Sequence, residues 1–422
     1  MKRRALGLLC LFVLMLPGWV VLGQQTIRFA DAKLEAAVRD AIYKPTGTLY
    51  DYDVNWLTVL DASGQGIKSL GGIEECTSLR FVDLSHNEIS DLGPLGSLEL
   101  IETLNLDGNA VSNLGALRGM ENLKDLRING NDVTDIQPLE TTVLLEVLSA
   151  LGPKVKDLEP LRRLTHLRVL EIHGEDGINL SPLHALTALE TLHIAAAAPL
   201  DLTALGRMES LSVLTLEKTG ISEFSPLRFL PVLQTLRLKS VDIDSLVHIV
   251  DVRPDLVGIG LESMQIDDFR PLTELADLES IRLVDVGFTE LGLLLGFKKL
   301  RTVNLSNNQL RDIDVLSALN RLTSLDLSDN EIDSLLSLST LTLLETLSVS
   351  GNPISDLEPL WRLRELQSLD LSKTDVTDIG VLIQLLSLEF VDLTDAALST
   401  SAGSSGAAVI ERLESDGVVV IY

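Results

Sequence analysis

An apolar residue, most often leucine, returns every 22 residues along most of this 422-residue chain. Residues 79–95 read LRFVDLSHNEISDLGPL, and the copy that begins at Ile101 repeats the pattern. Sixteen copies begin at residues 57, 79, 101, 123, 145, 167, 189, 211, 233, 256, 278, 300, 322, 344, 366 and 388. Fourteen of the 15 steps are 22 residues long, and the step from 233 to 256 is 23. Because such a chain grows by stacking, we expect one elongated solenoid rather than two or three globular domains.

The pattern inside each copy predicts the type of solenoid. A period of this length with L-x-x-L-x-L-x-x-N is typical of leucine-rich repeats. Alternating residues such as Val82-Asp83-Leu84 predict a short strand, and stacked strands would form a parallel sheet on the concave face. The Gly93-Pro94-Leu95 type of segment is too short for a long helix, so we expect 3-10 turns on the convex face. The predicted fold is an α/β leucine-rich-repeat solenoid.

The remaining segments predict a leader and two caps. Residues 1–23 resemble a secretory signal, with the basic run Lys2-Arg3-Arg4 before an apolar stretch; an uncleaved membrane anchor is the alternative. In residues 24–56, Asp31 precedes apolar residues at helical spacing, which predicts an N-capped amphipathic helix over the first repeat. The repeats occupy 57–398, and 399–422 predict a short helix and a closing strand. We expect no separate enzymatic domain.

Charge and cysteine content narrow the function. The formal charge is 34 − 61 = −27, and 31 − 61 = −30 once residues 1–23 are removed. A nucleic-acid partner is therefore not expected, and an anionic membrane surface would repel the chain. Cys76 would be the only cysteine of the processed chain, so no intramolecular disulfide can form. Its repeat position is elsewhere occupied by residues such as Leu98 and Leu164, which predicts a buried thiol.

Stacking turns repeat positions into columns. One column holds asparagine near both ends of the chain, where its amide can satisfy turn backbone groups, but the middle repeats lack it through drift or a different constraint. A second column holds mostly Asp, Asn and Ser, from Ser69 and Asp91 to Asp378. A row of carboxylates could bind calcium, but these three residue types are the ones preferred for capping the start of a helical turn. We therefore interpret this column as capping.

A mixed-charge patch is expected on the concave face of the central repeats. The candidate partner-binding residues are Arg127, Glu171, His173, His193, Glu217, Arg237, Lys239, Glu262 and Arg282. The alternative is a solvated strand face with incidental ion pairs, such as His193 beside Glu171. Strand spacing would also bring Glu171, His173 and His193 together, but no H-E-x-x-H or cysteine ligand set is present, so zinc is not predicted. No cofactor is expected, and no catalytic motif is found.

The quoted segment 79–95, together with 344–360 (LETLSVSGNPISDLEPL), resembles the internalin-type, 22-residue class of bacterial leucine-rich-repeat proteins. The resemblance covers about residues 57–398 and implies a secreted or surface-exposed binding protein. Neither an L-P-x-T-G motif nor an immunoglobulin-like domain follows the repeats, so host-cell invasion is not carried over. We expect a non-enzymatic scaffold that recognises a protein through its concave face. Binding of a carbohydrate or envelope polymer, and a purely structural envelope role, are the alternatives.

Overall fold

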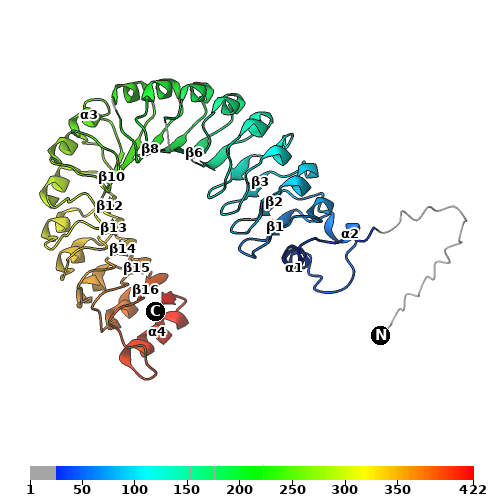
Figure 1. Cartoon of the computed structure of the whole chain (residues 1–422). Helices are drawn as coiled ribbons and strands as arrows, with labels where there is room; N and C mark the ends of the chain where they lie inside the picture. Colours follow the sequence, from blue (N-terminus) through cyan, green and yellow to red (C-terminus); the bar gives the residue numbers. More distant parts are fainter. Residues whose placement is uncertain (1–24, 153, 175–176, 222) are drawn as a thin grey trace, which may run out of the picture.

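The computed structural model describes residues 25–152, 154–174, 177–221 and 223–422, and it forms one curved array of repeats (Figure 1). The predicted signal segment, 1–23, lies outside the described residues. Within them, 17 strands form one sheet along the inner side of the arc, and each strand pairs in parallel with the next in sequence. Val59 pairs with Phe81, and Phe81 pairs with Thr103, so the register advances by one repeat. The leucine-rich-repeat solenoid predicted from the period is confirmed.

The strands are short at both ends of the sheet and longer in the middle. The three-residue strands are β1 (Val59–Asp61), β2 (Phe81–Asp83), β3 (Thr103–Asn105), β4 (Asp125–Arg127), β12 (Thr302–Asn304), β13 (Ser324–Asp326), β14 (Thr346–Ser348), β15 (Ser368–Asp370), β16 (Phe390–Asp392) and β17 (Val419–Ile421). The strands of five or six residues are β5 (Val147–Leu151), β6 (Val169–Gly174), β7 (Thr191–Ala196), β8 (Val213–Glu217), β9 (Thr235–Lys239), β10 (Gly258–Glu262) and β11 (Ser280–Val284). The middle of the concave face is therefore a wider sheet.

Local polar bonds end several of the short strands. In β2, the carboxylate of Asp83 accepts hydrogen bonds from the backbone N–H (2.9 Å) and the hydroxyl (2.6 Å) of Ser85. This side chain-to-backbone bond turns the chain out of the extended conformation. The same pairing joins Asp326 to Ser328 beyond β13. The repeats of β5–β11 carry neither an aspartate at this position nor the column asparagine, and their strands continue for two or three more residues.

The asparagine column ties successive repeats together. Asn87 is buried, and its amide donates to the carbonyls of Ala62, Leu84 and Ser85 at 2.9 to 3.1 Å. Its oxygen accepts from the backbone N–H of Ile67 in the preceding repeat at 2.9 Å. Unpaired backbone groups are costly when buried, so one side chain stabilises two adjacent turns. The predicted role of this column is confirmed.

Short turns cover the convex side, as predicted. Among the described residues, the 3-10 segments are η1 (Ile73–Glu75), η2 (Gly93–Ser97), η3 (Gly115–Leu117), η4 (Gln137–Thr141), η5 (Glu159–Arg163), η6 (Ser181–Ala185), η7 (Leu202–Arg207), η8 (Ser225–Phe229), η9 (Arg270–Glu274), η10 (Leu291–Gly296), η11 (Asp314–Ala318), η12 (Leu336–Thr340), η13 (Glu358–Arg362) and η14 (Gly380–Gln384). One repeat departs from this pattern. The 23-residue repeat instead holds a short α-helix, α3 (Val247–Val250), because its extra residue lets the turn close with α-type bonds.

The acidic column caps these turns. Asp91 accepts a hydrogen bond from the N–H of Gly93, the first residue of η2, at 2.8 Å, and Asp356 does the same for Glu358 at 2.9 Å. The capping interpretation is confirmed for these residues. The longer Glu223 departs from it, since its carboxylate accepts a hydrogen bond from the hydroxyl of Ser225.

The core is the stack of apolar columns between the sheet and the turns. Leu84, Leu106 and Ile128 succeed one another along it with at most 2% of their surface exposed. Burying each such side chain contributes roughly 2 kcal/mol. Cys76 is fully buried in the column it shares with Leu98, as its repeat position predicts.

Helical elements lie at both ends of the arc (Figure 1). Helix α1 (Ala32–Ala41) begins after Asp31, whose carboxylate accepts from the N–H of Lys33, and it buries Leu34 and Val38; α2 (Asp51–Val54) follows. At the other end, α4 (Ser405–Ser415) precedes β17, which pairs with β16. No helix of the described residues is both long and apolar enough to cross a membrane.

Candidate binding face

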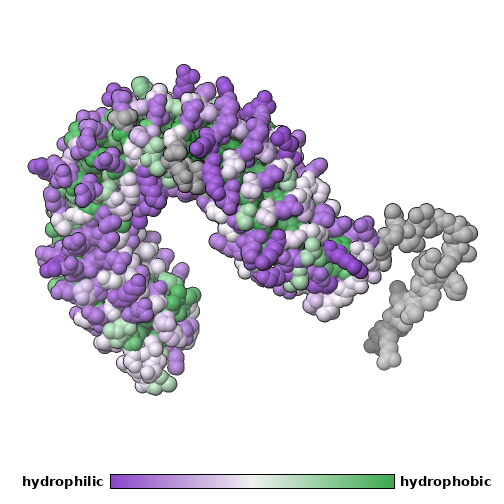
Figure 2. All heavy atoms as spheres, viewed as in Figure 1, coloured by the Kyte–Doolittle hydropathy of each residue, from purple (hydrophilic) through white to green (hydrophobic). Residues whose placement is uncertain are grey.

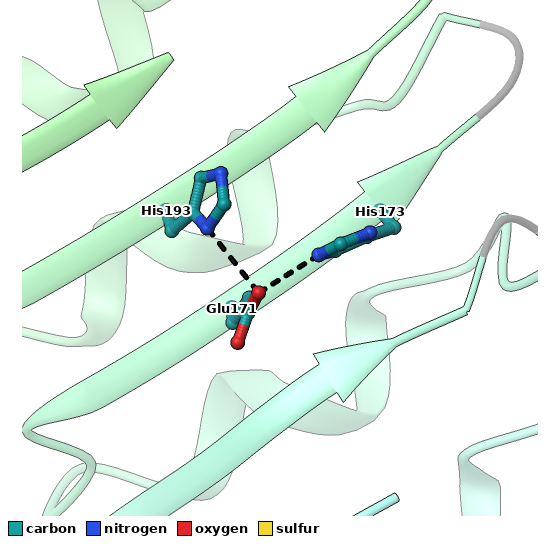
Figure 3. A group of neighbouring side chains, drawn as sticks. All are labelled: Glu171, His173 and His193. Atoms are coloured by element: carbon teal, nitrogen blue, oxygen red, sulfur yellow. Dashed lines mark hydrogen bonds and ion pairs between the residues drawn. The ribbon is translucent and has the colours of Figure 1, made fainter. Parts of the chain in front are cut away.

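The concave face lies open inside the arc, and hydrophilic residues dominate the visible surface of the molecule (Figure 2). At its centre, three of the predicted site residues meet on β6 and β7 (Figure 3). Oε1 of Glu171 lies 2.9 Å from Nε2 of His173 and 3.2 Å from Nδ1 of His193. The two histidine rings stand at 63° with centroids 5.6 Å apart. Hydrogen bonds from His173 and His193 hold the pKa of Glu171 well below its usual range.

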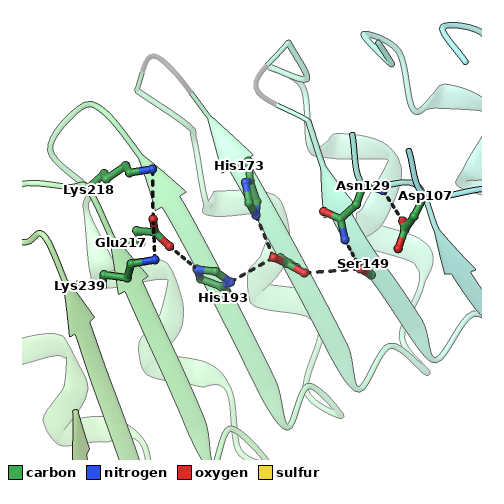
Figure 4. A network of polar contacts seen from close by, with 9 residues as sticks. Asp107, Asn129, Ser149, His173, His193, Glu217, Lys218 and Lys239 are labelled. Carbon is green, nitrogen blue, oxygen red and sulfur yellow. Dashed lines mark hydrogen bonds and ion pairs between the residues drawn. The ribbon is translucent and has the colours of Figure 1, made fainter. Parts of the chain in front are cut away.

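Glu217 on β8 extends this cluster (Figure 4). Its Oε2 lies 3.5 Å from Nε2 of His193, and its Oε1 lies 3.2 Å from Nζ of Lys218 and 3.4 Å from Nζ of Lys239. Only 11% of the Glu217 side chain is exposed. Burial acts to raise the pKa of Glu217, but Lys218 and Lys239 outweigh it, and the pKa lies below its ordinary value.

The cluster also continues toward the N-terminal repeats. The hydroxyl of Ser149 lies 3.5 Å from Oε2 of Glu171 and accepts a hydrogen bond from Nδ2 of Asn129 at 3.0 Å. The backbone N–H of Asn129 donates to Asp107 at 2.6 Å. One polar network therefore runs from Asp107 to Lys239, across β3–β9 (Figure 4).

Sequence reasoning missed four members of this network: Asp107, Asn129, Ser149 and Lys218. The first three occupy inward-facing repeat positions, but their side chains are of ordinary polar types and give no distinguishing signal. Lys218 follows β8 with a φ of 54°, at the repeat position that Gly108 and Gly130 hold with φ of 64° and 66°. A lysine at a repeat position that elsewhere holds glycine was the signal in the sequence that could have identified Lys218. Its left-handed backbone directs the side chain back over the end of β8, toward Glu217.

The other predicted residues lie outside the network. Nε of Arg282 on β11 lies 2.6 Å from Oε1 of Glu262 on β10. Arg237 on β9 is exposed and lies over the bare backbone of Gly260, where a Cβ atom would come within 3.0 Å of its side chain. Arg127 on β4 stands apart and pairs with Asp125 of its own strand at 3.3 Å. The predicted patch therefore has three parts: the network, an arginine pair formed by Arg237 and Arg282 on either side of β10, and the separate Arg127. Glu262 accompanies the arginine pair.

A hollow of about 510 Å³ adjoins the arginine pair on the same face. Arg237 and Arg282 line one part of it. Rows of hydroxyl, amide and carboxylate side chains line the rest, among them Thr302, Asn304, Ser324, Asp326, Thr346 and Ser348.

Comparisons with known proteins match this architecture. A family model described as "Leucine Rich repeats (2 copies)" matches residues 298–340, and one described as "Leucine Rich repeat" matches 75–93 and 363–382. No curated protein sequence matches the chain significantly.

Solved structures include several similar chains. Internalin C2 from Listeria monocytogenes is 31% identical over 50% of this chain and 94% of that one, with a TM-score of 0.48. Another internalin from L. monocytogenes is 24% identical over 86% of this chain and 95% of that one, with a TM-score of 0.48. A leucine-rich-repeat protein from Leptospira interrogans is 20% identical over 84% and 99%, with a TM-score of 0.47. The assignment to a family rests on the 31% sequence identity with internalin C2 over 94% of that chain, and not on structural superposition. This chain belongs to the internalin-type leucine-rich-repeat proteins.

Proposed function

We propose that this protein is a non-enzymatic, secreted or surface-exposed scaffold that binds a protein partner through the centre of its concave face. One observation carries the proposal: the repeats of β5–β11 depart from the polar scheme of the other repeats. At the ends of the face, the carboxylates of Asp83 and Asp326 accept hydrogen bonds from a serine two residues later in their own repeat. In the middle, the wider sheet presents larger side chains of both charges that contact across strands.

The exposed cations of this region suit a partner with acidic groups. The side chain of Arg237 has no ion pair or hydrogen bond among the described residues, and the Arg282 side chain is 40% exposed beside the hollow. Because the chain has a formal charge of −27, the two exposed arginines form a local positive region on an acidic molecule. Such a region favours one orientation of an acidic partner over others. The guanidinium of Arg237 is therefore available to a partner without first breaking an ion pair.

Affinity capture tests this proposal. The chain would be immobilised and exposed to the extracellular and envelope fractions of its source, and the retained protein would be identified. We expect Arg237→Glu and Arg282→Glu together to weaken binding of that partner by tenfold or more, with an unchanged circular dichroism spectrum. Arg321→Glu is the matched control, because Arg321 is exposed and lies in the segment between η11 and β13. Equal affinity of the double variant and the control would remove the central face as the binding surface.

The hollow beside Arg282 supports a second candidate, recognition of a carbohydrate or envelope polymer. Its rows of hydroxyl and amide groups can donate to and accept from sugar hydroxyls. A glycan array separates the two functions: saturable binding of a glycan, lost in Asn304→Ala with Asp326→Ala, would favour the polymer. Saturable binding of neither a protein nor a glycan would support a structural role.

A further inference from the structure

Glu171, His173 and His193 offer three metal-ligand atoms at one point of the concave face (Figure 3). One atom from each residue lies within 4.8 Å of the other two. The carboxylate oxygen sits between the two imidazole nitrogens, at 2.9 and 3.2 Å. Ligands about 2.1 Å from a tetrahedral zinc ion lie about 3.4 Å from one another. These donors therefore need only small side-chain rotations to surround an ion.

The donor types select a class of metal. Two imidazoles and one carboxylate suit zinc and other first-row transition metals, whereas calcium and magnesium favour all-oxygen sites. The ligands also lie on rigid elements. Glu171 and His173 are two residues apart on β6, so they share a face, and His193 is directly paired with Glu171 on β7. The hydrogen-bonded sheet thus fixes the relative positions of the Cα atoms of all three residues.

A second carboxylate supports the ring of His193 from behind (Figure 4). Nε2 of His193 is buried and makes no hydrogen bond, and Oε2 of Glu217 lies 3.5 Å from it. A metal bound at Nδ1 places the ring proton on Nε2, where it can be donated to Glu217. Metal-bound histidines commonly donate their second N–H to a carboxylate in this way. Metal binding at Nδ1 of His193 therefore accounts for a carboxylate placed at its Nε2.

We propose that Glu171, His173 and His193 form a binding site for a divalent transition-metal ion, zinc foremost, oriented by Glu217. The site has three protein ligands, and 39% of the His173 side chain is exposed to the concavity. Three-ligand zinc sites keep a position for an exogenous ligand. Here that ligand is water or a donor side chain brought by a partner. Sequence motifs do not indicate the site, because its ligands come from adjacent strands 22 residues apart.

Equilibrium dialysis of the full chain, purified without a histidine tag and stripped with chelator, tests the proposal directly. We expect one equivalent of Zn²⁺ to bind, and Co²⁺ to give the visible absorption bands of a tetrahedral nitrogen–oxygen site. Glu171→Gln, His173→Ala and His193→Ala should each weaken binding at least 100-fold. Glu217→Gln should weaken it about 10- to 100-fold, since it removes only the supporting carboxylate.

Controls make the outcome decisive. His166→Ala and His184→Ala remove an exposed and a half-buried histidine near the convex turns and should leave the affinity unchanged. Circular dichroism of each stripped variant establishes that the fold is kept. No stoichiometric binding by the wild-type chain, or equal binding by all variants, would overturn the proposal. Because no partner is present in this measurement, its result is independent of the proposed protein-binding function.

Discussion

Oδ1 of Asn308 accepts a hydrogen bond from the backbone N–H of Phe288, 20 residues earlier, at 2.9 Å. The amide of the same side chain donates to the carbonyls of Leu283, Leu305 and Ser306 at 2.6 to 3.0 Å. Asn308 is 1% exposed, so water cannot replace these bonds. A single side chain thereby joins two adjacent repeats.

We expect Asn308→Ala to lower the free energy of unfolding by about 3 kcal/mol, because it leaves several buried backbone groups without a partner. Asn320→Ala, at an exposed position, should change it by less than about 0.5 kcal/mol. Denaturant unfolding followed by circular dichroism measures both. Similar values for the two variants would contradict the role assigned to the asparagine column.

Arg253 replaces the leucine of a buried column, at the position held by Leu230 and Leu275 in the flanking repeats. It is 5% exposed; Nη2 donates to the carbonyl of Leu233 at 2.6 Å, and Nε is buried without a partner. We expect Arg253→Ala to destabilise by about 3 kcal/mol, since it leaves a cavity and unpaired carbonyls. Arg253→Leu should cost less or stabilise, because an apolar side chain of similar reach avoids burying the charge.

Thermal unfolding of the two Arg253 variants would separate these effects, with Arg270→Ala as an exposed control. Arg270 pairs with Asp268 on the surface, where such pairs contribute at most about 1 kcal/mol. If leucine proved as damaging as alanine, the guanidinium bonds rather than the filled volume would be the essential contribution.

Asp31 couples the stability of the N-terminal helix to pH. Hydrogen bonds from the backbone N–H groups of Lys68 and Lys33 lower its pKa from 3.8, outweighing partial burial. A lowered pKa means that the stabilisation is complete above the unfolded-state pKa and is lost as pH falls through the folded-state value. We expect Asp31→Ala to destabilise by about 1 kcal/mol at pH 7.

The difference between wild type and Asp31→Ala should shrink below about pH 4, as measured by denaturant unfolding across a pH series. Asp51→Ala is a useful comparison, because within the described part of the chain the carboxylate of Asp51 accepts a hydrogen bond only from the N–H of its neighbour Tyr52. A difference that stayed constant down to pH 2 would show that the charge of Asp31 contributes little.

Cys76 should be inert in the folded protein. Burial, together with Glu75 and Glu74, raises the pKa of its thiol to about 12, and the thiolate is the reactive form. In a Cys10→Ser background, we expect a thiol reagent at pH 8 to label no Cys76 before unfolding and one equivalent in denaturant. Rapid labelling under native conditions would mean that the first repeat opens readily.

Much of this architecture is predictable from the chain alone. The capping of η2 by Asp91 and the burial of Cys76 follow from repeat position, because every repeat places the same position in the same environment. The short helix α3 does not follow, since one added residue can be absorbed by several turn geometries. The buried Arg253 does not follow either, because the partners that stabilise it inside the core are backbone carbonyls, which carry no sequence signal.

The sequence by itself determined the solenoid, the parallel register and the set of residues that face the concavity, because a 22-residue apolar period can bury its leucines only by stacking in step. The tertiary structure decided how those inward residues combine. It widened the sheet at β5–β11, brought Lys218 onto Glu217, and placed Glu217 behind His193 rather than beside Arg237. Periodicity sets which strands are neighbours, whereas side-chain reach, rotamer and local turn geometry set which polar atoms come within bonding distance.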